Sequence, residues 1–319
     1  MTDIRHVQRY LQWRLYKLKR RLVRTVCRRL YQDRNRDTSH SFLIAGTGRS
    51  GTTWLADIVA SQLPCRIMFE PFYSKLVNDF SQFHYFHYMR PSDQDNDLLA
   101  YCKKILSGDI KHAWIDSQVD RIFSEYRLIK AIRANLFLKW LHNNFNETPL
   151  LFIIRHPCGV VLSRMQLNWA TDTDIEPFLA QPEFMRDFLT DKLDIISGAK
   201  TVEEKHAVIW CISNLVPLTQ FLPGELPIIF YENLCCQPEV EVPKVFAALG
   251  QPYHESIFSD LTKPSATTLR TSAILTDQDR IAHWKTELSP KQINNILSIV
   301  KSFALDYLYG DSTQPLVEL

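Results

Sequence analysis

Residues 46–53, GTGRSGTT, combine glycines with hydroxyl side chains and one arginine. Gly46 and Gly51 stand five residues apart, a spacing that lets the backbone fold round an anion. Backbone amides and the N-terminus of a following helix would then point at phosphate oxygens. The segment therefore predicts a site for the phosphates of a nucleotide.

The loop departs from the nucleoside-triphosphatase pattern, in which a lysine follows the second conserved glycine. Thr52 stands in that place, and the cation of the segment is Arg49. A second apolar run, PLLFII at 149–154, is followed by Arg155, where such enzymes carry an aspartate that helps to hold magnesium. A phosphate loop without these groups favours sulfuryl transfer over phosphoryl transfer and predicts no metal site.

Strands and helices must alternate to position these residues. A helix is expected over 52–63, after the glycine loop, because its apolar spacing is helical and Pro64 stops it. This alternation predicts an α/β fold with a P-loop-type central parallel β-sheet flanked by helices. The apolar runs of strand length, each separated from the next by a helical pattern, are residues 41–46, 65–72, 126–132, 149–155 and 226–232.

Ligands of such sheets bind beyond the carboxyl ends of the strands. The stretches 73–125 and 165–209 hold helices and polar loops, and we expect helical insertions there that roof an acceptor pocket. The first includes FSQFHYFHYM at 80–89, whose aromatic residues suit core packing or a pocket wall better than a metal site. The residues expected to converge at the strand ends are Gly46, Glu70, Lys130, Arg155 and Glu232.

Length, composition and cysteine content set the class of protein. A chain of 319 residues, 45% hydrophobic and 23% charged, has the amino-acid composition of an ordinary globular protein, which excludes collagen-like and disordered classes. Its seven cysteines form no C-x-x-C pair, so neither a disulfide framework nor a zinc cluster is indicated. The sequence predicts a reduced, intracellular protein.

The N-terminal segment is distinct in charge. Residues 1–36 carry twelve lysines and arginines against two aspartates, a net charge of +10, while the remainder has a balance of −8. Apolar residues recur every three or four positions from Ile4 to Leu30, which predicts an amphipathic helix about 40 Å long. We expect a basic helical extension over residues 1–37 and a second domain over residues 38–319.

A cation interrupts this extension every few positions, so it fits neither a secretory signal nor a membrane span. Its apolar stripe would pack on the protein's own body or on a second copy in a homo-oligomer. Another prediction is peripheral contact with an anionic membrane surface, which attracts basic amphipathic helices. Nucleic acid is not expected as a partner, because no basic patch continues into the body.

Three segments resemble one enzyme family. GTGRSGTTWL at 46–55 resembles the 5′-phosphosulfate loop of sulfotransferases that use 3′-phosphoadenosine 5′-phosphosulfate (PAPS). FIIRHPCGVVLSRM at 152–165 resembles their 3′-phosphate motif, and YENLCCQPEVEVPKVFAALG at 231–250 resembles a later strand-loop-helix. The resemblance covers residues 42 to about 300, looks more like the carbohydrate-type and bacterial branches, and implies that the second domain is a sulfotransferase domain.

The resemblance also implies how PAPS would be bound. Arg155 and Ser163 match the family's ligands of the 3′-phosphate, and Arg270 would close over that group. Trp54 would stack on adenine, and Tyr231 would border the same ring. The residues implied for the 5′-phosphosulfate are Thr47, Gly48, Arg49, Ser50, Gly51, Thr52 and Thr53.

An acceptor hydroxyl or amine must lose its proton, so a base has to lie within hydrogen-bond reach of it. Glu70, at the end of the second strand, is the first candidate, His206 is the second, and the pair His112 and Asp116, four residues apart, is the third. Lys130 ends a strand at the same edge and would steady the sulfuryl oxygens or pair with Glu70. Arg49 would stabilise charge on the bridging oxygen as the S–O bond breaks.

The predicted reaction moves a sulfuryl group from PAPS to a hydroxyl or amine of a small-molecule or saccharide acceptor. It would proceed by in-line displacement without a metal and release adenosine 3′,5′-bisphosphate (PAP). Saccharide, lipid-linked sugar, phenol and alkaloid acceptors all fit the sequence. The alternatives are a P-loop kinase or nucleotide hydrolase and a non-catalytic nucleotide-binding scaffold. We expect a cytoplasmic location, at the membrane surface if the N-terminal helix binds lipid.

Overall fold

The computed structural model describes residues 15, 18, 22–261 and 279–317. Five parallel strands form its central sheet, in the order β3-β5-β2-β6-β7. Each lies within one of the five runs expected from the sequence, which confirms the predicted α/β fold. The strands are β2 (Ser41–Gly46), β3 (Cys65–Phe69), β5 (Tyr126–Ala131), β6 (Leu150–Ile154) and β7 (Ile228–Phe230).

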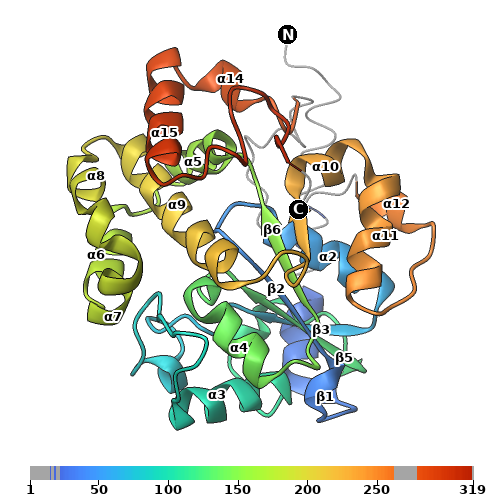
Figure 1. Cartoon of the computed structure of the whole chain (residues 1–319). Helices are drawn as coiled ribbons and strands as arrows, with labels where there is room; N and C mark the ends of the chain where they lie inside the picture. The colour runs from blue at the N-terminus through green and yellow to red at the C-terminus, as the bar shows by residue number, and fades with distance from the viewer. Residues whose placement is uncertain (1–14, 16–17, 19–21, 262–278, 318–319) are drawn as a thin grey trace.

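Helices pack on both faces of this sheet (Figure 1). Leu43 and Ala45 of β2 point into one hydrophobic core, whereas Phe42 and Ile44 point into the other. Successive side chains of a strand face opposite sides, so a sheet covered on both faces needs strands that are apolar throughout. The longer helices are α2 (Thr52–Gln62), α3 (Asn96–Leu106), α4 (Leu138–Asn144), α5 (Pro157–Gln166), α9 (Val202–Gln220), α11 (Pro238–Ala248) and α15 (Pro290–Ser302).

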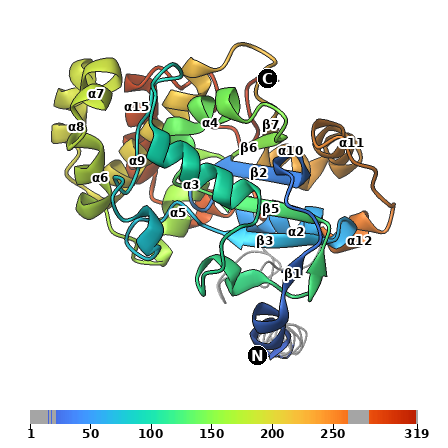
Figure 2. The ribbon, with the colours of Figure 1, turned by 90° about the horizontal axis from the view of Figure 1, so that it is seen from below.

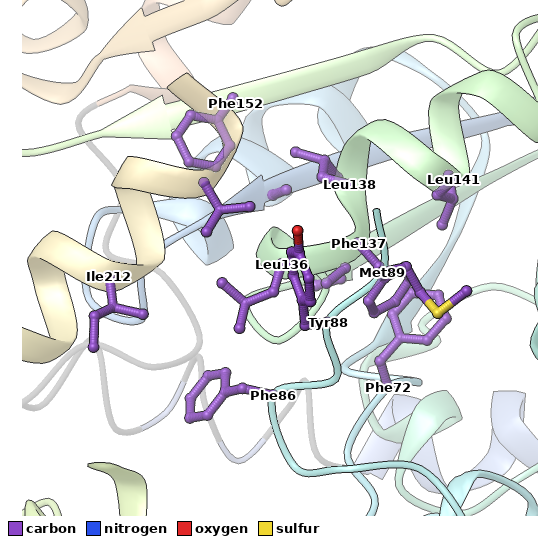
Figure 3. Packing of buried hydrophobic residues seen from close by; sticks show 14 of the residues in the cluster. Phe72, Phe86, Tyr88, Met89, Leu136, Phe137, Leu138, Leu141, Phe152 and Ile212 are labelled. Carbon is purple, nitrogen blue, oxygen red and sulfur yellow. The ribbon is translucent and has the colours of Figure 1, made fainter. Parts of the chain in front are cut away.

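The larger core holds the chain that follows β3. Phe72 packs edge-to-face on Phe137, with 5.1 Å between the ring centroids, and Figure 3 shows both rings among buried aliphatic and aromatic side chains. Tyr101 of α3 donates a hydrogen bond to the carbonyl of Pro71 at 2.7 Å. These contacts fix the backbone directly after Glu70, which stands at the end of β3.

Of the two expected insertions, residues 165–209 are largely helical, whereas residues 73–125 are mostly loop around α3. The shorter helices of the described chain are α6 (Asp172–Leu179), α7 (Pro182–Phe184), α8 (Leu193–Gly198), α10 (Tyr231–Cys236), α12 (Ile257–Asp260) and α14 (Trp284–Glu287). Residues 73–125 also contain a strand that the sequence did not predict, β4 (Phe123–Ser124), which pairs in parallel with β1 (Gln32–Asp33). Strands of two residues are too short to show an alternating pattern. No helix among the described residues is long and apolar enough to cross a bilayer.

The N-terminal helix ends at Leu30, where the apolar stripe in the sequence also ends. The chain after it is tied into the body through Asp33, whose side chain is 3% exposed and pairs with Arg66 at 2.7 Å. The same carboxylate accepts a hydrogen bond from the Tyr31 hydroxyl and lies 3.8 Å from Arg127. Arg66 also pairs with Asp116 at 2.8 Å, so the ion pairs form one buried cluster.

We expect Asp33→Asn to lower the free energy of unfolding by about 3 kcal/mol or more, because it removes one of two carboxylates facing two buried arginines. Urea denaturation followed by circular dichroism measures this change. Asp109→Asn is the matched control, since Asp109 pairs with Arg36 at 2.8 Å on the exposed surface and should cost less than about 1 kcal/mol. Equal losses in both variants would show that burial does not strengthen the Asp33 cluster.

Candidate active site

A cavity of about 570 Å³ opens at the carboxyl ends of the strands. All five strands of the sheet deliver a residue to its wall. These residues are Arg49 after β2, Glu70 after β3, Arg133 after β5, Arg155 after β6 and Tyr231 after β7. Convergence of strand ends is the general arrangement of ligand sites in parallel sheets, and here it gathers charged side chains from distant parts of the sequence.

At two glycines of the loop, a side chain would collide with a neighbouring aromatic ring. Gly51 has a φ of +100°, and a Cβ atom there would lie 2.7 Å from the ring of Tyr231. A Cβ atom on Gly48 would lie 2.7 Å from the ring of Trp169. Within the loop, the hydroxyls of Thr47 and Ser50 are buried, have no hydrogen-bond partner among the described residues and do not line the cavity. Buried hydroxyls are usually satisfied, so these two are exceptions.

The glycine loop and the segment 152–165 are in direct contact. Nε of Arg49 donates a hydrogen bond to Oγ of Ser163 at 3.0 Å, and a guanidinium N–H of Arg155 donates to the carbonyl of Arg49 at 3.2 Å. The Arg155 guanidinium lies 4.3 Å from the ring centroid of Tyr231, and that ring meets Trp54 edge-on at 5.4 Å. The two phosphate motifs therefore share one wall, with an aromatic pair beside them.

The cavity is strongly cationic. Burial, reinforced by repulsion from Arg155, lowers the pKa of Arg49 to about 10, so the side chain stays charged at neutral pH. Only Glu70 and Asp174 bring carboxylates to the wall among the described residues. This excess of positive charge suits an anionic ligand. The lysines and arginines on the wall are Arg49, Lys75, Lys130, Arg133, Arg155 and Arg280.

Glu70 is buried and held from three sides. Phe69 is the register partner of Lys130 in the β3–β5 pair, so the next residue lies beside Lys130, whose ammonium donates to the Glu70 carboxylate. Arg133 donates to the same carboxylate at 3.0 Å, and the Ile132 amide lies 3.2 Å from both of its oxygens. Burial lowers the pKa of Lys130, and the carboxylate beside it opposes that shift. The expected convergence of Glu70 and Lys130 is thus present.

Backbone strain is concentrated at this cavity. Four non-glycine residues of the described chain have positive φ angles, and three of them line the wall: Arg49 at 81°, Glu70 at 48° and Asn168 at 50°. Side chains with a Cβ atom adopt this region at a cost of about 1 to 3 kcal/mol, and such residues cluster where function requires them. The geometry singles out Arg49 and Glu70 independently of their charge.

Several residues predicted for the site, His206, His112 and Glu232 among them, do not line the cavity. His206 is fully buried and absent from the cavity wall; its Nδ1 accepts a hydrogen bond from Nε of Arg164 at 3.0 Å. Burial lowers the pKa of His206 to about 3, so it is a neutral packing partner of α5. Arg270 falls outside the described residues. Glu232 is also buried away from the wall and accepts from the His156 amide at 2.9 Å.

The wall includes residues that the sequence reasoning missed. Arg133 follows β5 by two positions, so the strand-end rule that identified Lys130 applies to it as well. Tyr73, Tyr85 and Trp114 come from the insertion at 73–125, and no sequence pattern separates them from aromatic residues that fill the core. Tyr85 lies in the segment 80–89, whose neighbouring residues Phe83 and Phe86 are buried in the core.

No group of three or more His, Cys, Asp or Glu side chains in the described part of the chain is arranged to hold a metal ion. The model of the sulfotransferase domain matches residues 39–303. A curated relative, the nodulation protein NoeE of Sinorhizobium fredii, is 23% identical in an alignment of 294 positions that covers 83% of this chain. The alignment spans 65% of that relative, slightly less than two thirds of its length.

Solved structures of sulfotransferases are also similar. The sulfotransferase domain from the curacin biosynthetic pathway has a TM-score of 0.41 at 15% identity, over 82% of this chain and 96% of that one. A sulfotransferase from Alicyclobacillus acidocaldarius has a TM-score of 0.42 at 14% identity, over 84% of this chain and 94% of that one. The domain match covers residues 39–303, which are most of this chain. The chain therefore belongs to the sulfotransferase family.

Proposed function

We propose that this chain transfers a sulfuryl group from PAPS to a hydroxyl or amine and releases PAP. PAPS carries negative charge at both ends of its ribose, so its enzyme needs two anion sites a few ångströms apart. The observation that carries the proposal is the 3.0 Å contact between Arg49 of the glycine loop and Ser163 of the second phosphate motif. It sets two anion-binding segments side by side on one cationic cavity.

The donor would lie along that shared wall. Loop amides and Arg49 would face the 5′-phosphosulfate. Arg155 and Ser163 would grip the 3′-phosphate, since a guanidinium and a hydroxyl both donate to a dianion. The pair formed by Trp54 and Tyr231 would border the adenine ring.

In the transfer step, the acceptor oxygen or nitrogen attacks sulfur and the bond from sulfur to the 5′-phosphate oxygen breaks. The acceptor proton passes to the Glu70 carboxylate, and the leaving phosphate oxygen takes the electron pair of the broken bond. Arg49 and the loop amides stabilise the charge that grows there. Lys130 would move its contact from Glu70 to the sulfuryl oxygens, which frees one carboxylate lone pair for the proton.

The acceptor half of the cavity is aromatic. Phe69 and Trp114 lie 5.2 Å apart, Trp114 and Tyr73 5.7 Å, and Tyr73 and Tyr85 5.4 Å, measured between ring centroids. All four rings line the cavity next to Glu70. Aromatic faces bind flat, partly apolar surfaces, so we infer an acceptor that presents a sugar ring or a phenol ring to this wall.

Calorimetric binding of PAP tests the donor site. We expect the wild-type chain to bind PAP more tightly than ADP, which lacks the 3′-phosphate. Arg155→Gln should weaken PAP binding about tenfold to a hundredfold, the loss expected when hydrogen bonds to a charged group are removed. The same variant should reduce the ratio of PAP affinity to ADP affinity. Arg186→Gln is the control, because Arg186 is exposed and does not line the cavity. Equal affinity for PAP and ADP in the wild type would contradict the proposal.

Transfer itself requires sulfur-labelled PAPS and a panel of saccharides, phenols and amines. Labelled product with any acceptor, abolished by Arg155→Gln at low PAPS concentration, supports sulfuryl transfer. Normal PAP binding without transfer to any acceptor would favour a non-catalytic nucleotide-binding protein instead.

A further inference from the structure

The N-terminal helix leaves its apolar stripe uncovered. Leucine and valine side chains recur along it at intervals of three or four residues, which places them on one side of a helix. A different side of the helix meets the body: Cys27 of the helix is 8% exposed, Tyr31 directly after the helix is 2% exposed, and both pack with Val119. The stripe consists of Leu15 (67% exposed), Leu18 (57%), Leu22 (64%), Val26 (55%) and Leu30 (55%).

The helix is held in this orientation. Its end is followed at once by the β1–β4 pairing and by the buried ion pairs of Asp33. Arg28 donates to the carbonyl of Ala113 at 3.3 Å, and Lys111 donates to the carbonyl of Tyr31 at 3.1 Å. Figure 2 shows the helix at the margin of the molecule, beyond β1 and away from the five-stranded sheet. Rotating the stripe onto the body would break these contacts.

Exposed apolar side chains continue next to the helix. The Gln32 amide donates to the carbonyl of Ile122 at 2.8 Å, so β4 lies directly after the end of the helix. Ile122 is 39% exposed and Phe123 49% exposed. The Arg34 guanidinium lies 5.5 Å from the ring centroid of Phe123, so a cation stands within this apolar surface.

Charge decides which partner fits the stripe. Arg28 and Arg29 are exposed, and the sequence of residues 1–36 carries a net charge of +10. A second copy packed stripe to stripe would set two such segments against each other, which like charges oppose. At an anionic lipid surface, the leucines can be buried among the acyl chains while the arginines contact negative headgroups.

We propose that this helix docks the protein on the surface of a membrane rich in anionic lipid, with Leu15, Leu18, Leu22, Val26 and Leu30 inserted at the level of the headgroups. The helix lies in the plane of the surface and does not cross it. Docking holds the segment 111–119 near the surface, and Trp114 of that segment lines the cavity. The proposal does not depend on sulfuryl transfer.

Vesicle flotation with the full chain tests it. We expect binding to vesicles of phosphatidylcholine with phosphatidylglycerol, at least tenfold weaker binding to phosphatidylcholine alone, and loss of binding as salt screens the charges. Leu22→Ser together with Val26→Ser should lower binding to the anionic vesicles more than tenfold. Both positions are exposed, so circular dichroism and PAP affinity should stay at wild-type values.

The matched control is Leu222→Ser together with Val240→Ser, an exposed leucine and valine outside the helix, 72% and 50% exposed. It should bind vesicles like the wild type. Equal binding to neutral and anionic vesicles would overturn the role of charge. Absence of vesicle binding would overturn the proposal, and a dimer in analytical ultracentrifugation that the helix variant abolishes would assign the stripe to a second copy instead.

Discussion

Glu70→Gln is expected to lower the rate of sulfuryl transfer by about a hundredfold or more, because glutamine cannot accept the proton of the acceptor. Affinity for PAP should change little, since Glu70 lies on the side of the cavity away from the Arg155–Ser163 pair in the proposed pose. Single-turnover transfer of labelled sulfuryl groups to an acceptor found in the panel measures the rate, and calorimetry measures PAP binding.

The control must separate catalysis from the loss of a lysine partner. Glu225 accepts a hydrogen bond from Lys139 and does not line the cavity, so Glu225→Gln removes a more exposed lysine–glutamate pair elsewhere. It should leave turnover unchanged. Thermal unfolding of both variants shows whether the buried cations Lys130 and Arg133 destabilise the Glu70→Gln protein. A folded Glu70→Gln protein that turns over within a few-fold of wild type would remove Glu70 from the role of base.

Arg49→Gln is expected to lower turnover by about a hundredfold to a thousandfold. A charge placed beside the breaking S–O bond acts mainly in the transition state, so the loss should appear in the rate far more than in PAP affinity. The same single-turnover assay measures it. The pKa of Arg49, about 10 after the effect of burial, keeps the wild-type side chain charged across the neutral range.

Arg49→Lys distinguishes charge from geometry. Lysine keeps the positive charge but lacks the planar group that donates to Ser163. Recovery of most of the rate in this variant would mean that charge dominates, whereas a rate as low as that of Arg49→Gln would mean that the Arg49–Ser163 contact positions it. Near-normal turnover in Arg49→Gln would contradict a catalytic role.

The sheet and the glycine loop were predictable because each rests on a local rule. A strand buried on both faces must be apolar along its length, as residues 150–154 are, and the strand-end rule then brought Glu70, Lys130 and Arg155 to one edge. Local rules failed where tertiary contacts decide. His206 has the titration range of a base in the sequence, but packing against Arg164 turns it away from the cavity.

Other features left no local signal at all. Tyr73 and Trp114 look like core aromatics until the fold turns them toward Glu70, and the two-residue strand β4 forms only because the N-terminal segment lies beside it. Exposure of the stripe on the N-terminal helix depends in the same way on which side of the helix meets the body. The sequence pattern shows the stripe but not its partner.

The left-handed backbone at Arg49 and Glu70 has a consequence for engineering. Glycine would relieve the strain at either position, so a search that rewards heat tolerance alone would tend to select it there. Each gain in robustness would then erase a side chain on which we expect turnover to depend. Libraries that aim for a hardier enzyme should hold these two codons fixed and look for improvement in surface loops.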